Sequence, residues 1–136
     1  MQNRAEKAVE LHAKGYNCCQ AVVCAYCDLF GIDEKTAFTL SEGFGAGMGG
    51  MENTCGAVSG MVMLAGMKKS CRDPELRNTK AVTYPVVKTM TKAFKDQNTT
   101  TICRELKGLD TGTVLRGCRD CIMDACHIVD ANLLND

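Results

Sequence analysis

The sequence predicts an all-α protein, a single-domain bundle of about five to six helices over residues 1–136. Apolar residues recur at helical spacing through most of the chain, and no stretch of convincing length alternates as a strand would. Capping residues and glycines divide the chain into segments of helical length. A length of 136 residues with 46% hydrophobic and 24% charged residues suits one globular domain.

The first two helices are marked by their ends. Residues 3–14 form an amphipathic segment that Gly15 ends. Its expected apolar face carries Ala5, Ala8, Val9 and His12. Asn17 is a good N-cap for a second helix over residues 18–30, which Gly31 ends. This second segment is apolar nearly all round, so we expect it at the centre of the bundle.

Two further helices surround a glycine-rich connection. Asp33 can cap a helix over residues 34–44, and the connection "GFGAGMGGMEN" follows it. The connection contains a G-x-G-x-x-G pattern, but no strand precedes it, so we do not interpret it as a dinucleotide site. The fourth helix is expected from about Thr54 to Lys69.

The C-terminal half predicts one long helix, one short helix and a final helix. Asp73-Pro74 resembles an N-cap followed by proline at the first helical position, and the helix could run to about Gln97. Pro85 should kink or split it. A short helix over residues 101–108 precedes the last one, at about 114–134. The apolar face of that last helix is expected to carry Leu115, Cys118, Ile122, Ala125, Val129 and Leu133.

Charge and hydropathy exclude several classes of function. Lys plus Arg number 16 and Asp plus Glu number 16, so no basic excess indicates nucleic-acid binding or an anionic membrane surface. The N-terminus has no continuous apolar core, and the most apolar window, residues 55–67, is shorter than the roughly 18 residues of a membrane span. We therefore expect a cytoplasmic protein. Its apolar helix could allow a homodimer.

Ten cysteines are the main chemical feature. In a reducing cytosol they are buried apolar residues, metal ligands or redox-active thiols. Cys18, Cys55 and Cys103 each fall in the first turn of a predicted helix. Free backbone N–H groups and the helix dipole favour an anion there and lower a thiol pKa. Three such placements indicate thiolate chemistry, although coincidence explains them equally well.

The other cysteines favour packing. Core burial is the simpler explanation for Cys19, Cys24, Cys27, Cys71 and Cys126. Two C-x-x-C pairs occur, Cys24/Cys27 and Cys118/Cys121, without the second closely spaced pair of a zinc ribbon. The first pair lies in mid-helix and indicates packing. The second becomes a candidate only if Cys118 meets the helix-start cysteines in space.

Small residues follow Cys55. Gly56 and Gly60 lie one helical turn apart, and glycine inside a helix costs about 1 kcal/mol relative to alanine. Close approach of another helix would compensate, and could bring a second thiol to Cys55. Tight packing without chemistry explains the glycines as well. If a cofactor binds, we expect Gly56 and Gly60 beside it.

Five motifs follow one another in a familiar order: "GYNCCQAVVCAY", "GFGAGMGG", "NTCGAVSG", "CRELKG" and "CRDCIMDA". From about residue 15 to 126 the chain resembles the C-GCAxxG-C-C family of redox-active proteins. The resemblance implies a small, helical prokaryotic protein with four characteristic cysteines, matching Cys18, Cys55, Cys103 and Cys118. Cys19 or Cys121 could share the role of its neighbour.

These observations lead to a redox hypothesis with open alternatives. Cys55 and Cys18 would be activated thiolates, with Cys103 and Cys118 as partners, working with an unknown redox partner in an oxidoreductase-like reaction. The thiols would either cycle between dithiol and disulfide or hold an iron–sulfur cluster. A zinc or copper(I) carrier is a second alternative. If a metal binds, its ligands would come from Cys18, Cys55, Cys103, Cys118 and Cys121. A helical interaction protein with structural cysteines is the third.

Overall fold

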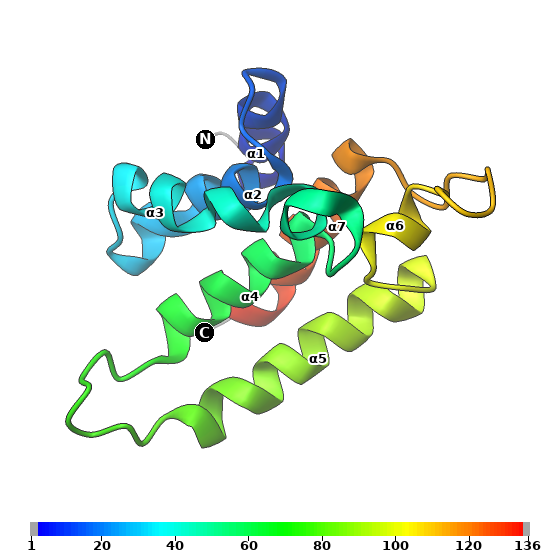
Figure 1. The fold of residues 1–136 in the computed structure, drawn as a ribbon. Coiled ribbons are helices and arrows are strands. Elements are labelled where there is room, and N and C mark those ends of the chain that lie inside the picture. The colour runs from blue at the N-terminus through cyan, green and yellow to red at the C-terminus, as the bar shows by residue number, and fades with distance from the viewer. Residues whose placement is uncertain (1–2, 135–136) are drawn as a thin grey trace.

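The computed structural model describes residues 3–134 and confirms the all-α fold class (Figure 1). Seven α-helices occur in these residues, rather than five or six. They are α1 (Arg4–Ala13), α2 (Cys18–Tyr26), α3 (Glu34–Ser41), α4 (Gly56–Lys69), α5 (Lys80–Asn98), α6 (Cys103–Leu106) and α7 (Cys118–Leu133). Short helical turns supplement them at η1 (Cys27–Phe30), η2 (Glu42–Phe44) and η3 (Gly47–Met51). The short helix expected near residues 101–108 is α6, which is only one turn long.

Side-chain caps begin the first three helices. The Asn3 side chain accepts a hydrogen bond from the Ala5 N–H at 2.8 Å. Asn17 and Gln20 form a reciprocal capping box at the start of α2, with bonds of 2.9 and 3.0 Å. The Asp33 carboxylate accepts from the Thr36 N–H at 3.0 Å. The caps predicted at Asn17 and Asp33 are confirmed.

Two helices begin later than predicted. The Asp73 carboxylate accepts from the Glu75 N–H at 2.9 Å, which closes a local turn, and α5 begins only at Lys80. Pro85 lies within α5 and does not split it. The last helix begins at Cys118 instead of near Val114. A cap-like dipeptide can close a turn without starting a helix, because the same side-chain bond serves both.

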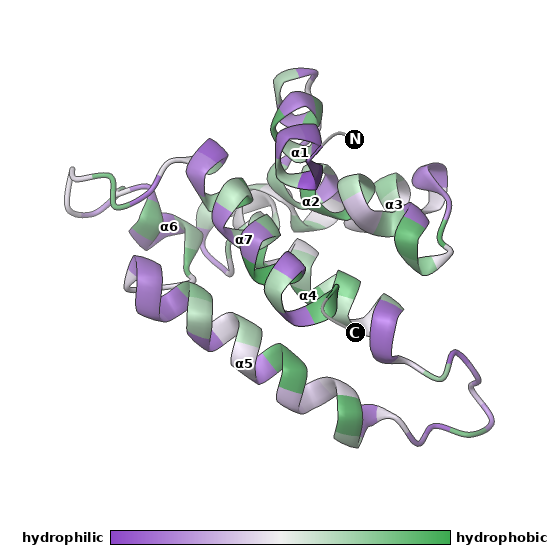
Figure 2. Cartoon of the chain, turned by 180° about the vertical axis from the view of Figure 1, so that it is seen from behind, coloured by the Kyte–Doolittle hydropathy of each residue, from purple (hydrophilic) through white to green (hydrophobic). Residues whose placement is uncertain are grey.

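The core surrounds α2, in which every residue is buried. This helix packs against α1, α4 and α7, while α5 packs against α4 and α7 (Figure 1). The Tyr26 hydroxyl, fully buried, donates to the Asp130 carboxylate at 2.8 Å and so ties α2 to α7. Both α1 and α5 carry hydrophilic as well as hydrophobic residues along their length, as helices do when one face packs on a core (Figure 2). The central position predicted for the second helix is confirmed.

Within residues 3–134, no helix combines the length and the apolar character that crossing a membrane requires.

Candidate functional site

Four cysteines lie where a helix begins. Cys18, Cys103 and Cys118 are the first residues of α2, α6 and α7, and Cys55 is the N-cap residue of α4. Three of these positions agree with the helix starts expected from the sequence, but Cys118 was expected inside the last helix. In the sequence, Gly117 could have indicated this helix start, because it is the N-cap residue of α7 and glycine is tolerated at that position.

A short backbone clamp joins two of these starts. The Cys55 N–H donates to the Thr101 carbonyl at 2.7 Å, and the Cys103 N–H donates to the Asn53 carbonyl at 2.8 Å. Thr54 and Ile102 thereby form an isolated antiparallel bridge. The chain before α4 and the chain before α6 are thus held side by side. Cys55 and Cys103 line one cavity as a result.

Glycines let α2 and α4 touch. A Cβ placed on Gly56 would lie 3.2 Å from the Cys18 Cβ and 3.1 Å from the Cys19 backbone nitrogen. A Cβ on Gly60 would lie 3.0 Å from the Val22 Cβ. The close approach expected from these small residues is therefore present. Gly56 lines the cysteine cavity, whereas Gly60 packs against α2 away from it.

Four of the cysteine thiols form two pairs, and the members of each pair shift each other's pKa. Cys18 on α2 pairs with Cys118 on α7, and Cys55 on α4 pairs with Cys121 on α7. All four are free thiols in the structure. We call Cys18/Cys118 the outer pair, because Cys118 is only half-buried, and Cys55/Cys121 the inner pair, because both are buried. The structure thus pairs Cys55 with Cys121 and not with Cys103.

Cys118 is the most acidic thiol of the outer pair. A hydrogen bond from the Cys18 thiol and the positive charge of Lys107 lower the pKa of Cys118 to about 5, with a smaller contribution from His12. Donating that hydrogen bond, together with burial, raises the pKa of Cys18 well above its ordinary value. Sequence reasoning expected Cys18 to be the thiolate. The pKa is lowered at Cys118 instead, which is less buried than Cys18 and lies beside the lysine.

Cys55 is the more acidic thiol of the inner pair. A hydrogen bond from Cys121 and the backbone N–H groups of Ala57 and Val58 lower its pKa to about 7 against the opposing effect of burial. This is the helix-start effect expected from the sequence. The pKa of Cys121 is raised by its hydrogen bond to Cys55 and by burial.

Lys107 is the functional residue that sequence reasoning missed. It is the C-cap residue of α6 and is half-buried beside both thiol pairs. Burial acts to lower its pKa, but the charges of Cys121 and Cys118 outweigh burial and raise it. Its only sequence signal was its position, one turn after Cys103. A single lysine among sixteen basic residues gives no reason to select it without the fold.

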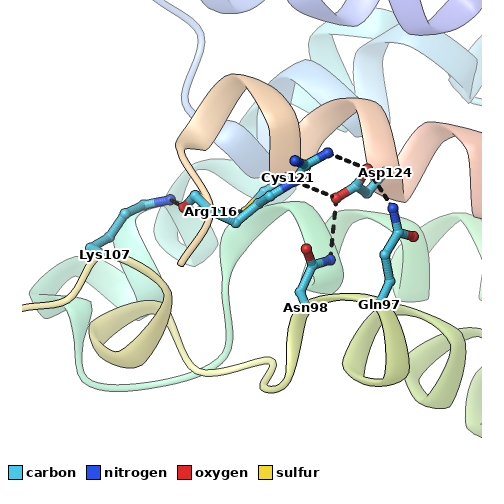
Figure 3. Close-up of polar contacts among 6 residues, drawn as sticks. All are labelled: Gln97, Asn98, Lys107, Arg116, Cys121 and Asp124. Atoms are coloured by element: carbon cyan, nitrogen blue, oxygen red, sulfur yellow. Dashed lines mark hydrogen bonds and ion pairs between the residues drawn. The ribbon is translucent and has the colours of Figure 1, made fainter. Parts of the chain in front are cut away.

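A buried carboxylate holds the chain that leads into α7 (Figure 3). Asp124 is 4% exposed and accepts two bonds from the Arg116 guanidinium, at 2.9 and 3.0 Å. Gln97 and Asn98, at the end of α5, donate to the same carboxylate at 3.1 and 3.2 Å. The segment just before Cys118 is thereby fixed to both α5 and α7.

The same segment contacts the site directly. The Arg116 carbonyl accepts a hydrogen bond from Lys107 Nζ at 3.3 Å and one from Cys121 Sγ at 3.9 Å (Figure 3). Because Arg116 is held by Asp124, its carbonyl fixes the lysine and one inner-pair thiol together. Asp124 therefore positions the site without lining it.

The outer pair opens onto a cavity of about 310 Å³. Its walls include Cys18, Cys55, Cys103, Cys118, Lys107 and His12. Cys103 lies on this wall without a thiol partner, and burial raises its pKa. A larger cavity of about 650 Å³, between the end of α5 and α6, is lined by threonines and charged residues and contains no cysteine.

The remaining cysteines are mostly packing residues. Cys19, Cys24, Cys27 and Cys126 are buried, as expected. Cys71 is not: it lies half-exposed in the connection between α4 and α5, so its assignment to the core is wrong. In the described part of the chain, no three or more His, Cys, Asp or Glu side chains are grouped as they would be to hold a metal ion.

One comparison with known proteins gives a match. A family model described as "Putative redox-active protein (C_GCAxxG_C_C)" matches residues 16–132. The match includes all four helix-start cysteines and Cys121. No curated protein and no solved structure matches the chain.

Proposed function

The chain belongs to the C_GCAxxG_C_C family, and on that premise we propose that it exchanges thiols and disulfides through its outer pair. The observation that carries the proposal is the Cys18/Cys118 pair itself. Two free thiols from distant segments line the wall of one cavity and shift each other's pKa, with Lys107 on the same wall. Two nearby thiols and one stabilised thiolate are the requirements of dithiol chemistry.

Cys118 makes the first attack. Its thiolate attacks one sulfur of a substrate disulfide, so that a bond forms between Cys118 and that sulfur while the substrate S–S bond breaks. The departing substrate sulfur takes a proton from solvent. Cys118 suits this role because it is half-buried rather than sealed, and because its pKa near 5 keeps it ionised at neutral pH.

Cys18 completes the exchange. It loses its proton, attacks Sγ of Cys118 and forms the Cys18–Cys118 disulfide, while the second substrate thiol leaves. The substrate gains two electrons and the outer pair loses two. The raised pKa of Cys18 suits a resolving thiol, which stays protonated until the mixed disulfide removes its hydrogen-bond partner.

Pairing favours exchange over the metal alternatives. Among the described residues, the site sulfurs interact as two separate pairs, and no three or more potential ligands are grouped around a point. An iron–sulfur cluster or a structural zinc site would draw on four such ligands at once. The interaction-protein alternative does not account for a half-buried lysine on the same cavity wall as the thiols.

A trapping experiment tests the proposal. In a Cys71→Ser background, which removes the half-exposed loop thiol, the anaerobic reduced protein is mixed with hydroxyethyl disulfide and analysed by peptide mass mapping. We expect the further variant Cys18→Ser to accumulate the mixed disulfide on Cys118, whereas the parent releases both substrate thiols. The proposal fails if Cys118 reacts no faster than buried Cys126, or if purified protein carries stoichiometric iron or zinc that blocks the thiols.

A further inference from the structure

The exchange described above leaves the inner pair unused. Cys55 is 1% exposed and Cys121 is not exposed at all, so neither can meet a substrate as large as a protein directly. Yet Cys55 has a lowered pKa, unlike the buried packing cysteines. A sealed thiol that is nevertheless acidic suits a reaction with another sulfur of the same protein.

The two pairs share helices and lie against each other. Cys118 and Cys121 are three residues apart on α7, and so project from the same side of that helix. Cys18 and Cys55 are brought together where α2 meets α4 at Gly56, and both line the same cavity. Each sulfur of the outer pair therefore has an inner-pair sulfur as its neighbour.

We propose that the inner pair is an internal electron donor, which reduces the outer disulfide after the first exchange, so that the two pairs together hold four electrons. The inference rests on the proposed function, since the outer disulfide is the product of that exchange. No external oxidant or reductant takes part in the transfer itself.

The transfer takes two steps. In the first, the Cys55 thiolate attacks Sγ of Cys18, the Cys18–Cys55 bond forms, and Cys118 leaves as a thiolate. In the second, Cys121 loses its proton and attacks Sγ of Cys55, the Cys55–Cys121 bond forms, and Cys18 leaves and takes up a proton. The outer pair has gained two electrons and the inner pair has lost two.

The arrangement of charges determines which sulfur is attacked first and which thiolate leaves. The thiol with the lower pKa is the better leaving group, so attack on Cys18 expels Cys118, whose thiolate Lys107 stabilises. The alternative first step, Cys121 attacking Cys118, would require a disulfide between residues three apart in the first turn of α7. That geometry strains the bond. The route through Cys18 and Cys55 avoids it.

The same charges determine the direction in which electrons move between the two pairs. A stabilised thiolate favours the reduced form of its pair, which makes the disulfide of that pair the stronger oxidant. The outer pair contains the better stabilised thiolate, because Cys118 is only half-buried and lies beside Lys107, whereas Cys55 is 1% exposed and burial opposes its ionisation. Electrons should therefore move from the inner pair to the outer pair.

Mapping disulfides after limited oxidation tests the inference. Reduced protein in the Cys71→Ser background receives one molar equivalent of hydroxyethyl disulfide, is left to equilibrate without oxygen, and is quenched in acid before alkylation. We expect Cys55–Cys121 to exceed Cys18–Cys118 at least tenfold, with the outer disulfide appearing only with a second equivalent. An equilibrium product of Cys18–Cys118 with Cys55 and Cys121 free would overturn the relay and leave the proposed function standing.

A variant isolates the intermediate. Cys121→Ser removes the second attack, so the relay predicts a Cys18–Cys55 linkage and uptake of one equivalent instead of two. Cys126→Ser, at a buried cysteine one to two turns further along α7, should still take up two. If Cys121→Ser takes up one equivalent with no Cys18–Cys55 linkage, the route is wrong. Failure of Cys118 to react at all would instead refute the proposed function.

Discussion

Cys18 and Cys19 are adjacent in the sequence, yet they belong to different regions of the molecule. Cys19 lies in the core, where its Sγ is 3.7 Å from the Met63 sulfur and burial raises its pKa to about 12. Cys18 begins α2 and lines the cavity wall together with Cys118, which shifts its pKa. The same contrast separates Cys118 and Cys121 from Cys126, whose pKa burial also raises to about 12.

Burial alone therefore does not distinguish the two regions. Cys55 is as buried as the core thiols, but its pKa falls to about 7. What differs is the set of neighbours: a second thiol that donates a hydrogen bond, free N–H groups at a helix start, and the Lys107 cation. On the proposed function, the paired thiols near helix starts are the reactive end of this bundle, and single thiols in mid-helix are packing.

The largest expected effect is on reaction rate. Cys118→Ser should slow the reaction of the Cys71→Ser protein with hydroxyethyl disulfide at pH 7 by at least about 100-fold, because the only strongly acidic site thiol is lost. Cys126→Ser, the core counterpart, should leave the rate within about twofold. Stopped-flow release of the substrate thiol measures both. Equal rates in the two variants would abolish the distinction between the regions.

A substitution of Asp124 tests the buried network that holds the segment before Cys118. Asp124→Ala should lower the free energy of unfolding by about 2–4 kcal/mol, because Arg116, Gln97 and Asn98 lose a buried acceptor. The exposed pair of Lys92 and Asp96 is the control, and Asp96→Ala should cost at most about 0.5 kcal/mol. Urea unfolding measures both changes. Similar losses would show that the buried network contributes no more than a surface pair.

Two glycines of α4 extend the comparison, because one is in close contact with α2 and the other is not. Gly56→Ala should destabilise the protein by about 1–3 kcal/mol, because the new Cβ would press on the α2 backbone and Cys18. Gly66→Ala, further along the same helix with no atom within 4 Å, should stabilise by about 0.5–1 kcal/mol. Thermal unfolding gives the two signs. If Gly56→Ala is also stabilising, α2 and α4 do not meet as described.

The smallest effect concerns Lys107. Lys107→Gln removes a cation that lowers the pKa of Cys118, so the thiolate fraction should fall at acid pH and remain complete at pH 8. We expect the alkylation rate of Cys118 to drop about two- to fivefold at pH 5.5 and to be unchanged at pH 8. Lys92→Gln, at an exposed position, is the matched control. A drop of the same size at both pH values would point to distortion of the site instead of a charge effect.

Local signals in the sequence predicted the starts of α2 and α4 and the glycine contact between them. They failed where the determining contacts are distant. At the start of α7, Gly117 is a weak local signal, whereas the segment before it is held by Arg116 bonding to Asp124 and by α5 residues that bond to the same carboxylate. The choice of Cys121 over Cys103 as the partner of Cys55 depends on how α7 packs on α4. Lys107 becomes visible only when α6 is placed beside both pairs.

The central claim is that Cys118 is a stabilised thiolate at a helix start, and its titration tests this most directly. The rate of Cys118 alkylation by iodoacetamide in the Cys71→Ser protein is measured from pH 4 to pH 10, site by site, by mass spectrometry. The account predicts that the rate reaches half its maximum near the pKa of about 5, with Cys126 unreactive throughout. A midpoint near the value of an ordinary thiol, about 8.5, would contradict it.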